Sequence, residues 1–200
     1  MTEHITQKSG IVSVASLQIR MKEERDEPVY AYCLFCITQR CAVIAKLIEI
    51  RGVNRAFSPR IIRKQRKQGR NIERSFDLLP GYVFVYSDER LTDDRIFYGI
   101  DGVIRRMGRQ DDGYELKGPD FDFAMRLLEK DGLVGTMKIC RIGDEVVLED
   151  PLFSGCQGRI IGIDYRKERA KVEFVFDKNS CSTWISLEDV KRLQKAEEEL

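Results

Sequence analysis

The sequence predicts an α+β protein, in which an antiparallel sheet flanked by helices is followed by a small β-barrel. Three observations support this fold class. A strand rich in aromatic residues follows the turn at Pro80-Gly81, two other stretches repeat apolar residues at helical spacing, and the chain beyond residue 143 contains only short β runs separated by Gly, Asp and Asn. Strands and helices that alternate first, and strands alone afterwards, favour a layered sheet followed by a separate barrel.

The first predicted strand covers 29–37 and is apolar on both faces, which is typical of a central strand. Thr38 is placed to cap the helix that follows, whose apolar positions are Cys41, Ile44, Ala45 and Ile48. We expect this helix to cover one face of the sheet. Residues 1–28 end in a charged run closed by a proline, and we expect them to form a tail outside the fold.

The next segment is strongly basic and predicts a projecting hairpin. Its two arms cover 55–64 and 71–78 and are joined at Gln68-Gly69-Arg70. Between Arg51 and Arg74 the chain holds nine Arg or Lys residues and one acid, Glu73. Since the net charge of the chain is only +1, this local patch favours contact with an acidic partner, although it could also be an ordinary solvated hairpin.

Beyond the Pro80-Gly81 turn, period-two spacing places Tyr82, Phe84 and Tyr86 on one face of a strand. That face could be core or a docking surface, and the strand alone leaves both open. A helix is expected over 88–97, extended pieces over 102–107 and 114–116, and a second helix after Pro119, with apolar positions Phe121, Ala124, Met125 and Leu128.

The domain organisation follows from these elements. We expect a sheet domain over 29–130, a linker over 131–142, a barrel over 143–192 and an acidic tail over 193–200. The barrel strands are predicted at 144–149, 156–163, 169–176 and 181–186, because short strands in so few residues bury a core only by curling closed. A final helix is predicted to be capped at 186–189.

Several functions find no support in the residues. The only histidine, His4, lies in the predicted tail, and the Gly-rich stretch 155–162 lacks the Lys-Ser/Thr of a phosphate loop, so we expect no enzyme, metal or cofactor. Cys33 and Cys36 form a CxxC, but residues three apart on a strand face opposite sides. No apolar run reaches the roughly 18 residues of a membrane span, and we expect a monomeric cytoplasmic protein with reduced thiols.

Four motifs carry a resemblance to a known family. Leu79-Pro80-Gly81-Tyr82-Val83-Phe84-Val85 resembles the phenylalanine-proline-glycine-tyrosine strand in the N-terminal (NGN) domain of NusG-type transcription elongation factors. Three later motifs resemble the KOW barrel of that family: Gly143-Asp144-Glu145-Val146-Val147, Gly155-Cys156-Gln157-Gly158-Arg159-Ile160-Ile161-Gly162-Ile163-Asp164 and Ala170-Lys171-Val172-Glu173-Phe174. The resemblance spans residues 29 to 192.

This resemblance implies two surfaces. The first is an apolar hollow on the sheet that binds the clamp helices of RNA polymerase, and the matching positions here are Tyr32, Leu79, Pro80, Tyr82 and Phe84. The second faces the polymerase gate loop and the non-template DNA, and the barrel of some family members binds RNA. The positions implied for nucleic acid are Arg40, Arg63, Lys64, Arg66, Lys67 and Arg70 before the barrel, and Arg159, Arg166, Lys167, Arg169 and Lys171 within it.

The motifs also depart from the family pattern. The leading tryptophan falls at Ala31, the phenylalanine before the Pro-Gly turn at Leu79, and an expected aromatic at Arg106. The basic turn of the barrel, the missing pausing residues and the cysteine-rich, atypical strands resemble a specialised paralog, such as the LoaP-type antiterminators. This resemblance implies processive antitermination with a barrel that binds RNA, Rho or a ribosomal protein. Two alternatives remain open: an RNA- or ribosome-binding KOW protein without polymerase function, and a metal or redox protein built on Cys33 and Cys36.

Overall fold

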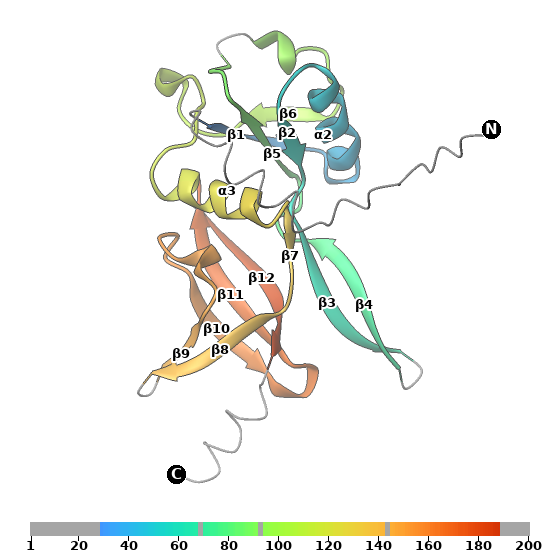
Figure 1. The fold of residues 1–200 in the computed structure, drawn as a ribbon, viewed down its shortest axis with the longest axis vertical. Coiled ribbons are helices and arrows are strands. Elements are labelled where there is room, and N and C mark those ends of the chain that lie inside the picture. The colour runs from blue at the N-terminus through green and yellow to red at the C-terminus, as the bar shows by residue number, and fades with distance from the viewer. Residues whose placement is uncertain (1–28, 68–69, 92–93, 143–144, 189–200) are drawn as a thin grey trace, which may run out of the picture.

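The computed structural model describes residues 29–67, 70–91, 94–142 and 145–188 (Figure 1). Its architecture is α+β, as predicted: a helix-flanked antiparallel sheet, a projecting hairpin and a small barrel. The elements before the barrel are β1 (Tyr30–Cys36), η1 (Thr38–Arg40), α2 (Cys41–Ile50), β2 (Arg55–Phe57), β3 (Arg60–Lys67), β4 (Arg70–Asp77), β5 (Tyr82–Ser87), η2 (Asp94–Ile96), β6 (Val103–Arg106), η3 (Gln110–Asp112), α3 (Pro119–Glu129) and β7 (Leu133–Val134). The barrel elements are β8 (Met137–Ile142), β9 (Glu145–Leu148), η4 (Pro151–Phe153), β10 (Arg159–Asp164), η5 (Tyr165–Lys167), β11 (Arg169–Phe176) and β12 (Asn179–Glu188).

The central sheet has the strand order β2-β5-β1-β6, and all of its pairs are antiparallel. β1 therefore lies between two neighbours, as its apolar faces predicted. Its register pairs Tyr32 with Val85 and Cys33 with Phe84. Because paired residues share a face of the sheet, this register divides the sheet into two faces with separate surroundings.

Helix α2 covers one of these faces. The residues that it buries are the four predicted ones, Cys41, Ile44, Ala45 and Ile48. The predicted cap at Thr38 is wrong, because Thr38 already lies in the 3₁₀ turn η1 and no side chain caps that turn or the helix. The helix expected over 88–97 is also wrong: among the residues described there, only the short η2 is helical.

Side-chain hydrogen bonds explain the missing helix. The backbone N–H of Asp88 donates to Asn54 Oδ1 at 3.1 Å, and that of Glu89 donates to Ser87 Oγ at 3.2 Å. Side chains that satisfy the first N–H groups offer the backbone an alternative to helical hydrogen bonds.

The basic hairpin is formed by β3 and β4, with β7 running parallel to β3 on the other side. Its first arm starts at Arg60 rather than at Arg55, since Arg55–Phe57 forms β2 of the central sheet. The hairpin projects from the body beside the barrel (Figure 1).

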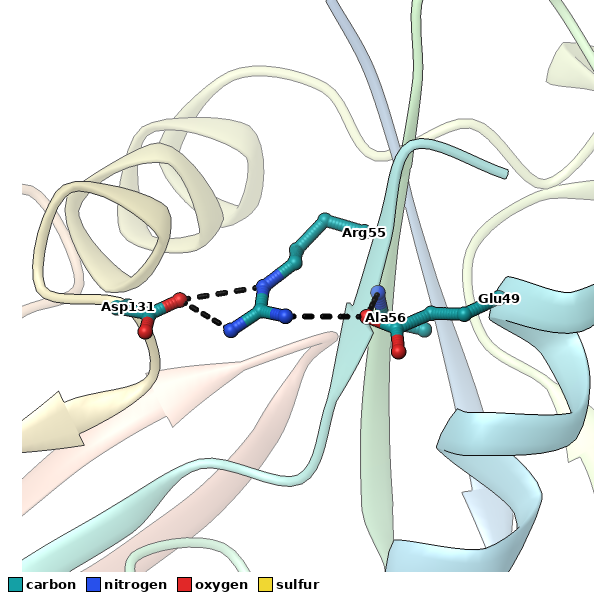
Figure 2. Close-up of polar contacts among 4 residues, drawn as sticks. All are labelled: Glu49, Arg55, Ala56 and Asp131. Carbon is teal, nitrogen blue, oxygen red and sulfur yellow. Dashed lines mark hydrogen bonds and ion pairs between the residues drawn. The ribbon is translucent and has the colours of Figure 1, made fainter. Parts of the chain in front are cut away.

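An ion-pair network holds the elements that meet where the hairpin leaves the sheet (Figure 2). Arg55 on β2 donates to Asp131 Oδ1 from Nε at 3.1 Å and from Nη2 at 2.5 Å, and to Glu49 Oε1 at 3.3 Å. The same Glu49 oxygen accepts the N–H of Ala56 at 3.0 Å. Because Glu49 lies on α2 and Asp131 follows α3, this network fixes both helices relative to β2.

The barrel sheet has the strand order β10-β11-β12-β8-β9, and its edge strands β9 and β10 contact each other. The strands predicted for this region are therefore found in order. Within the predicted linker over 131–142, β7 and β8 occupy most of the residues and both join sheets. β12 continues to Glu188, so residues 186–188 are strand; the rest of the predicted final helix and both tails lie outside the described residues.

Helix α3 lies between the central sheet and the barrel (Figure 1). It buries Phe123, Ala124 and Leu127, while the predicted Phe121, Met125 and Leu128 are partly buried around them. One continuous apolar cluster therefore includes sheet, helix and barrel residues. Within the described part of the chain, no helix is long and apolar enough to cross a membrane.

Candidate functional site

The candidate site is the sheet face that carries Tyr82, Phe84 and Tyr86, and the period-two prediction for these three residues is confirmed. The resemblance implies an apolar hollow that lies open to a partner at this face, and that expectation is wrong, because the face is covered. Phe84 has no exposed surface and Tyr86 is 1% exposed, while Tyr82 is half-buried. The residues that cover them come from α3 and from the barrel, whereas α2 covers the opposite face of the sheet.

Aromatic rings make most of this interface. The ring of Phe176 on β11 lies 5.7 Å from that of Tyr82 and 5.3 Å from that of Phe84, centroid to centroid. Phe123 of α3 packs against both the sheet and the barrel, with its ring 6.2 Å from Phe84, 5.6 Å from Phe176 and 5.5 Å from Phe174. Tilted and edge-to-face pairs at these distances add to the free energy gained by burial.

Polar contacts surround these rings. On α3, Arg126 donates to the carbonyl of Ser154, and Lys130, the residue after the helix, pairs through Nζ with Asp150 Oδ2 at 2.8 Å. At the start of the same helix, Asp120 Oδ1 accepts the N–H of Asp177 at 3.1 Å. Burial raises the pKa of Asp120, and that hydrogen bond opposes the rise. The barrel is thus held to α3 at both ends of the helix.

The five residues implied for polymerase binding do not form one surface. Tyr32 lies on the opposite face of the sheet, under α2, where its hydroxyl accepts the N–H of Leu91 at 2.9 Å. The cause is the register, since Tyr32 pairs with Val85 and not with an aromatic residue of β5. Leu79 is buried in the cluster shared with the barrel, and Pro80 is exposed beside it. Tyr82, Phe84 and Leu79 are therefore together, and Tyr32 is apart.

The basic residues before the barrel are dispersed. Arg40 forms an ion pair with Asp101. Arg63 is half-buried and reaches the barrel, whereas Lys64 and Arg70 are exposed. The side chains of Arg66 and Lys67 lie outside what the structure describes, although both residues belong to β3.

Carboxylates accompany most of the basic residues of the barrel. Arg159 pairs with Glu173 at 2.5 Å, and Lys167 and Arg169 pair with Asp164 at 3.9 and 3.1 Å. Arg166 is exposed and Lys171 is half-buried. The Arg159 hydrogen bond is also the main cause that lowers the pKa of Glu173.

The cysteines are placed as structural thiols. Cys33 belongs to the cluster that includes the barrel and Cys36 to the cluster under α2, so the predicted opposite orientation is confirmed. Burial, followed by the neighbouring Cys41, raises the pKa of Cys36 to about 12. A reactive thiol requires a lowered pKa, and this position therefore disfavours redox chemistry.

Three residues of the site were not singled out from the sequence. Phe176 lies within an alternating strand and is indistinguishable by pattern from a residue that packs only inside the barrel. Asp120 reads as an ordinary helix first-turn acid. Trp184, which packs under the guanidinium of Arg169 at 4.2 Å, is the only tryptophan in the chain, and its uniqueness is the signal that could have drawn attention to it.

Comparisons with known proteins find similar solved structures. No protein-family model matches the chain, and no curated protein matches it. A structure described as "Domain interaction in Thermotoga maritima NusG" superposes with a TM-score of 0.46 at 18% sequence identity, over 80% of this chain and 94% of that one.

Proposed function

We propose that this protein is a transcription elongation factor of the NusG type, which binds the clamp helices and gate loop of RNA polymerase and promotes processive antitermination. In this proposal the sheet face of Tyr82 and Phe84 contacts the clamp helices. The barrel binds nascent RNA or a second protein such as Rho or a ribosomal protein, and basic residues contact the non-template DNA.

The observation that carries the proposal is the composition and covering of this face. Tyr82, Phe84 and Leu79 present aromatic and aliphatic side chains, and the rings that cover the first two come from α3 and from the C-terminal barrel. Exposed, such a face would match the anchors by which grooves accept amphipathic helices. The sequence motifs at 79–85 and in the barrel support the same family by resemblance.

Polymerase binding through this face requires the barrel to leave it. A partner that binds only the open form pays the free energy of opening, and its apparent affinity falls by the open fraction. The polar contacts of Lys130 and Arg126 with the barrel add to the burial of the rings in favouring the closed form. Once the sheet face is bound, the released barrel is free to recruit RNA or protein at high effective concentration.

The decisive experiment is transcription across an intrinsic terminator by purified bacterial RNA polymerase, with and without the full-length protein. The proposal predicts that the protein increases readthrough. It also predicts that Tyr82→Ala raises the protein concentration required for that readthrough about tenfold, as for the loss of an interface anchor worth roughly 1.4 kcal/mol. Tyr98→Ala is the matched control, because Tyr98 is 82% exposed and remote from the face. Readthrough that is unchanged by Tyr82→Ala would contradict the proposed face.

The alternative of an RNA- or ribosome-binding barrel without polymerase function predicts a different result. Binding to RNA or ribosomes would then be unchanged by Tyr82→Ala, and the protein would neither bind purified polymerase nor alter termination.

A further inference from the structure

The β3–β4 hairpin separates its charges between its two faces. Its register pairs Arg63 with Arg74, and it pairs Lys64 with Glu73 and Arg60 with Asp77 on the other side of the ribbon. Arg60 and Asp77 form an ion pair at 3.0 Å. Like charges directly opposite each other on an antiparallel pair destabilise it, so the Arg63–Arg74 pair costs the hairpin free energy that the other face does not.

Alternation along β4 adds Arg70 to the face of Arg74, about 14 Å away at roughly 3.4 Å per residue. Within the described side chains, this face carries three arginines and no acid: Arg63, Arg70 and Arg74. We call it the arginine face. Arginine forks match phosphate groups better than any other side chain does.

The arginine face meets the barrel at Arg63. Its Nε donates to the carbonyl of Trp184 at 2.8 Å and its Nη2 to Thr183 Oγ1 at 3.1 Å, while the ring of Phe76 lies 4.8 Å from its guanidinium carbon. These partners are neutral, and no carboxylate pairs with Arg63 among the described residues. Burial and then the charge of Arg169 lower the pKa of Arg63.

The barrel presents an aromatic ring next to this contact. Trp184 pairs with Lys171 in the register of β11 and β12. Their neighbours along the strands, Ala170, Val172 and Ile185, are buried in the core, so Trp184 and Lys171 lie on the outer side. The indole is half-buried, with the Arg169 guanidinium 4.2 Å from its centroid. Two acids lie nearby: Asp164 pairs with Arg169 at 3.1 Å, and Glu173 pairs with Arg159 at 2.5 Å. After the hydrogen bond from Arg159, the charge of Lys171 also helps to lower the pKa of Glu173, which leaves the arginine face as the main source of excess positive charge.

A positive surface beside a partly exposed aromatic ring is typical of sites for single-stranded nucleic acid, in which arginines contact phosphates and bases stack on rings. An acidic peptide would need the charges but not the indole. A membrane surface would favour clustered exposed apolar residues, which this region lacks among its described side chains: Arg70, Arg74 and Glu73 are exposed here.

We propose that the arginine face and the outer surface of β11–β12 around Trp184 form one composite site for single-stranded RNA or DNA, present only while the barrel is docked. The inference rests on the proposed function only in taking nucleic acid as the ligand. It assigns ligand binding to the closed form, whereas polymerase binding requires the open one, so the two states would compete.

The test titrates the full-length protein with 12-nucleotide single-stranded RNA, single-stranded DNA of the same sequence and the corresponding DNA duplex. Because Trp184 is the only tryptophan, its fluorescence reports stacking directly. We expect quenching by a single strand and little by the duplex; the arm that binds tighter identifies RNA or DNA as the ligand. Tighter binding of the duplex, or binding without quenching, would overturn the site.

Two variants separate the faces of the hairpin. Arg74→Ala should weaken binding and reduce the slope of log affinity against log salt by about 0.7, the value for one phosphate contact of a single strand. Arg60→Ala is the matched control, since it removes one exposed arginine from the opposite face of the same ribbon. Equal effects of the two variants would contradict a site on the arginine face.

Two variants test the indole by fluorescence anisotropy of a labelled strand. Trp184→Ala should weaken binding by about 5- to 150-fold, the range for loss of one stacked base, and Trp184→Phe should retain most of it. If Trp184→Ala fails to fold, Trp184→Phe and the wild-type quenching still decide. If the wild-type protein binds the oligonucleotide but does not alter termination, the proposed function fails and this site stands. If it alters termination but does not bind the oligonucleotide, this site fails and the proposed function stands.

Discussion

At Gly132 the backbone has φ = +70°, and a Cβ built there would lie 2.4 Å from Cδ2 of Phe57. Both the left-handed conformation and the contact with a ring require glycine. The carbonyl of Gly132 also accepts the N–H of Arg60 at 2.7 Å, so the residue fixes where the hairpin leaves the sheet.

Gly132→Ala should therefore lower the free energy of unfolding by about 1–3 kcal/mol, measured by chemical denaturation. Gly135→Ala is the control, because nothing lies within 4 Å of the added methyl group and the backbone there is not left-handed. An effect of Gly132→Ala no larger than that of Gly135→Ala would show that the turn relaxes freely.

Tyr86 offers a second test at this scale. Its buried hydroxyl donates to the carbonyl of Ala124 at 2.7 Å and ties β5 to α3. Tyr86→Phe should cost about 1 kcal/mol of stability in the same denaturation measurement. Tyr98→Phe, at a position that is 82% exposed, should cost nothing measurable; a similar cost at both positions would mean that the buried hydrogen bond adds nothing.

Single residues also mark the limit of prediction from sequence. Alternation along one strand correctly separates Cys33 from Cys36 and groups Tyr82 with Phe84, because period two is a local property. The relative faces of Tyr32 and Tyr82 depend instead on the register between β1 and β5, which no local pattern contains. The error at Tyr32 follows from that difference.

At the scale of elements, the faces of α2 were predictable because apolar spacing dictates burial in an amphipathic helix. The two missed strands, β7 and β8, are different: β7 is two residues long and gains its pairing from β3 of the distant hairpin. Glycines on either side of such a short strand resemble a linker until its partner is known.

Helix α3 carries the pH-sensitive contact of the interface. Burial raises the pKa of Asp120, so its protonated form is favoured in the folded protein. This preference stabilises the folded protein fully at pH values below 3.8, the ordinary carboxyl pKa. The stabilisation is lost as pH rises through the raised pKa of Asp120 in the folded protein. Asp112 and Glu173 act oppositely, since hydrogen bonds from Lys117 and Arg159 lower their pKa values.

Asp120→Asn should isolate this contribution. Relative to wild type, the variant should be more stable at pH 7, with the difference shrinking as pH approaches 4, because asparagine can still accept the N–H of Asp177 without carrying a charge. Thermal unfolding measured across this pH range checks the prediction. A difference that is constant with pH, or that grows toward acid, would contradict the assigned cause.

For the whole molecule, the sequence predicts a sheet followed by a barrel but not their docking. Val172, Phe174 and Phe176 alternate as residues of a barrel core should, and the same alternation is compatible with Phe176 reaching Tyr82 and Phe84. Contact between two preformed surfaces depends on their shapes, which the periodicity of either segment does not specify. The covered aromatic face is thus a property of the assembled chain.

The most direct test is the affinity of purified RNA polymerase for a variant whose barrel is loosened. Lys130→Glu replaces the 2.8 Å pair with Asp150 by repulsion, and Lys117→Glu is the matched control, since it breaks the 2.6 Å pair with Asp112 away from the barrel. The account predicts that Lys130→Glu binds polymerase about tenfold tighter than wild type, equivalent to roughly 1.4 kcal/mol of closing free energy. It also predicts that adding Tyr82→Ala removes the gain. Equal affinity of wild type and Lys130→Glu, or tight binding that survives Tyr82→Ala, would contradict it.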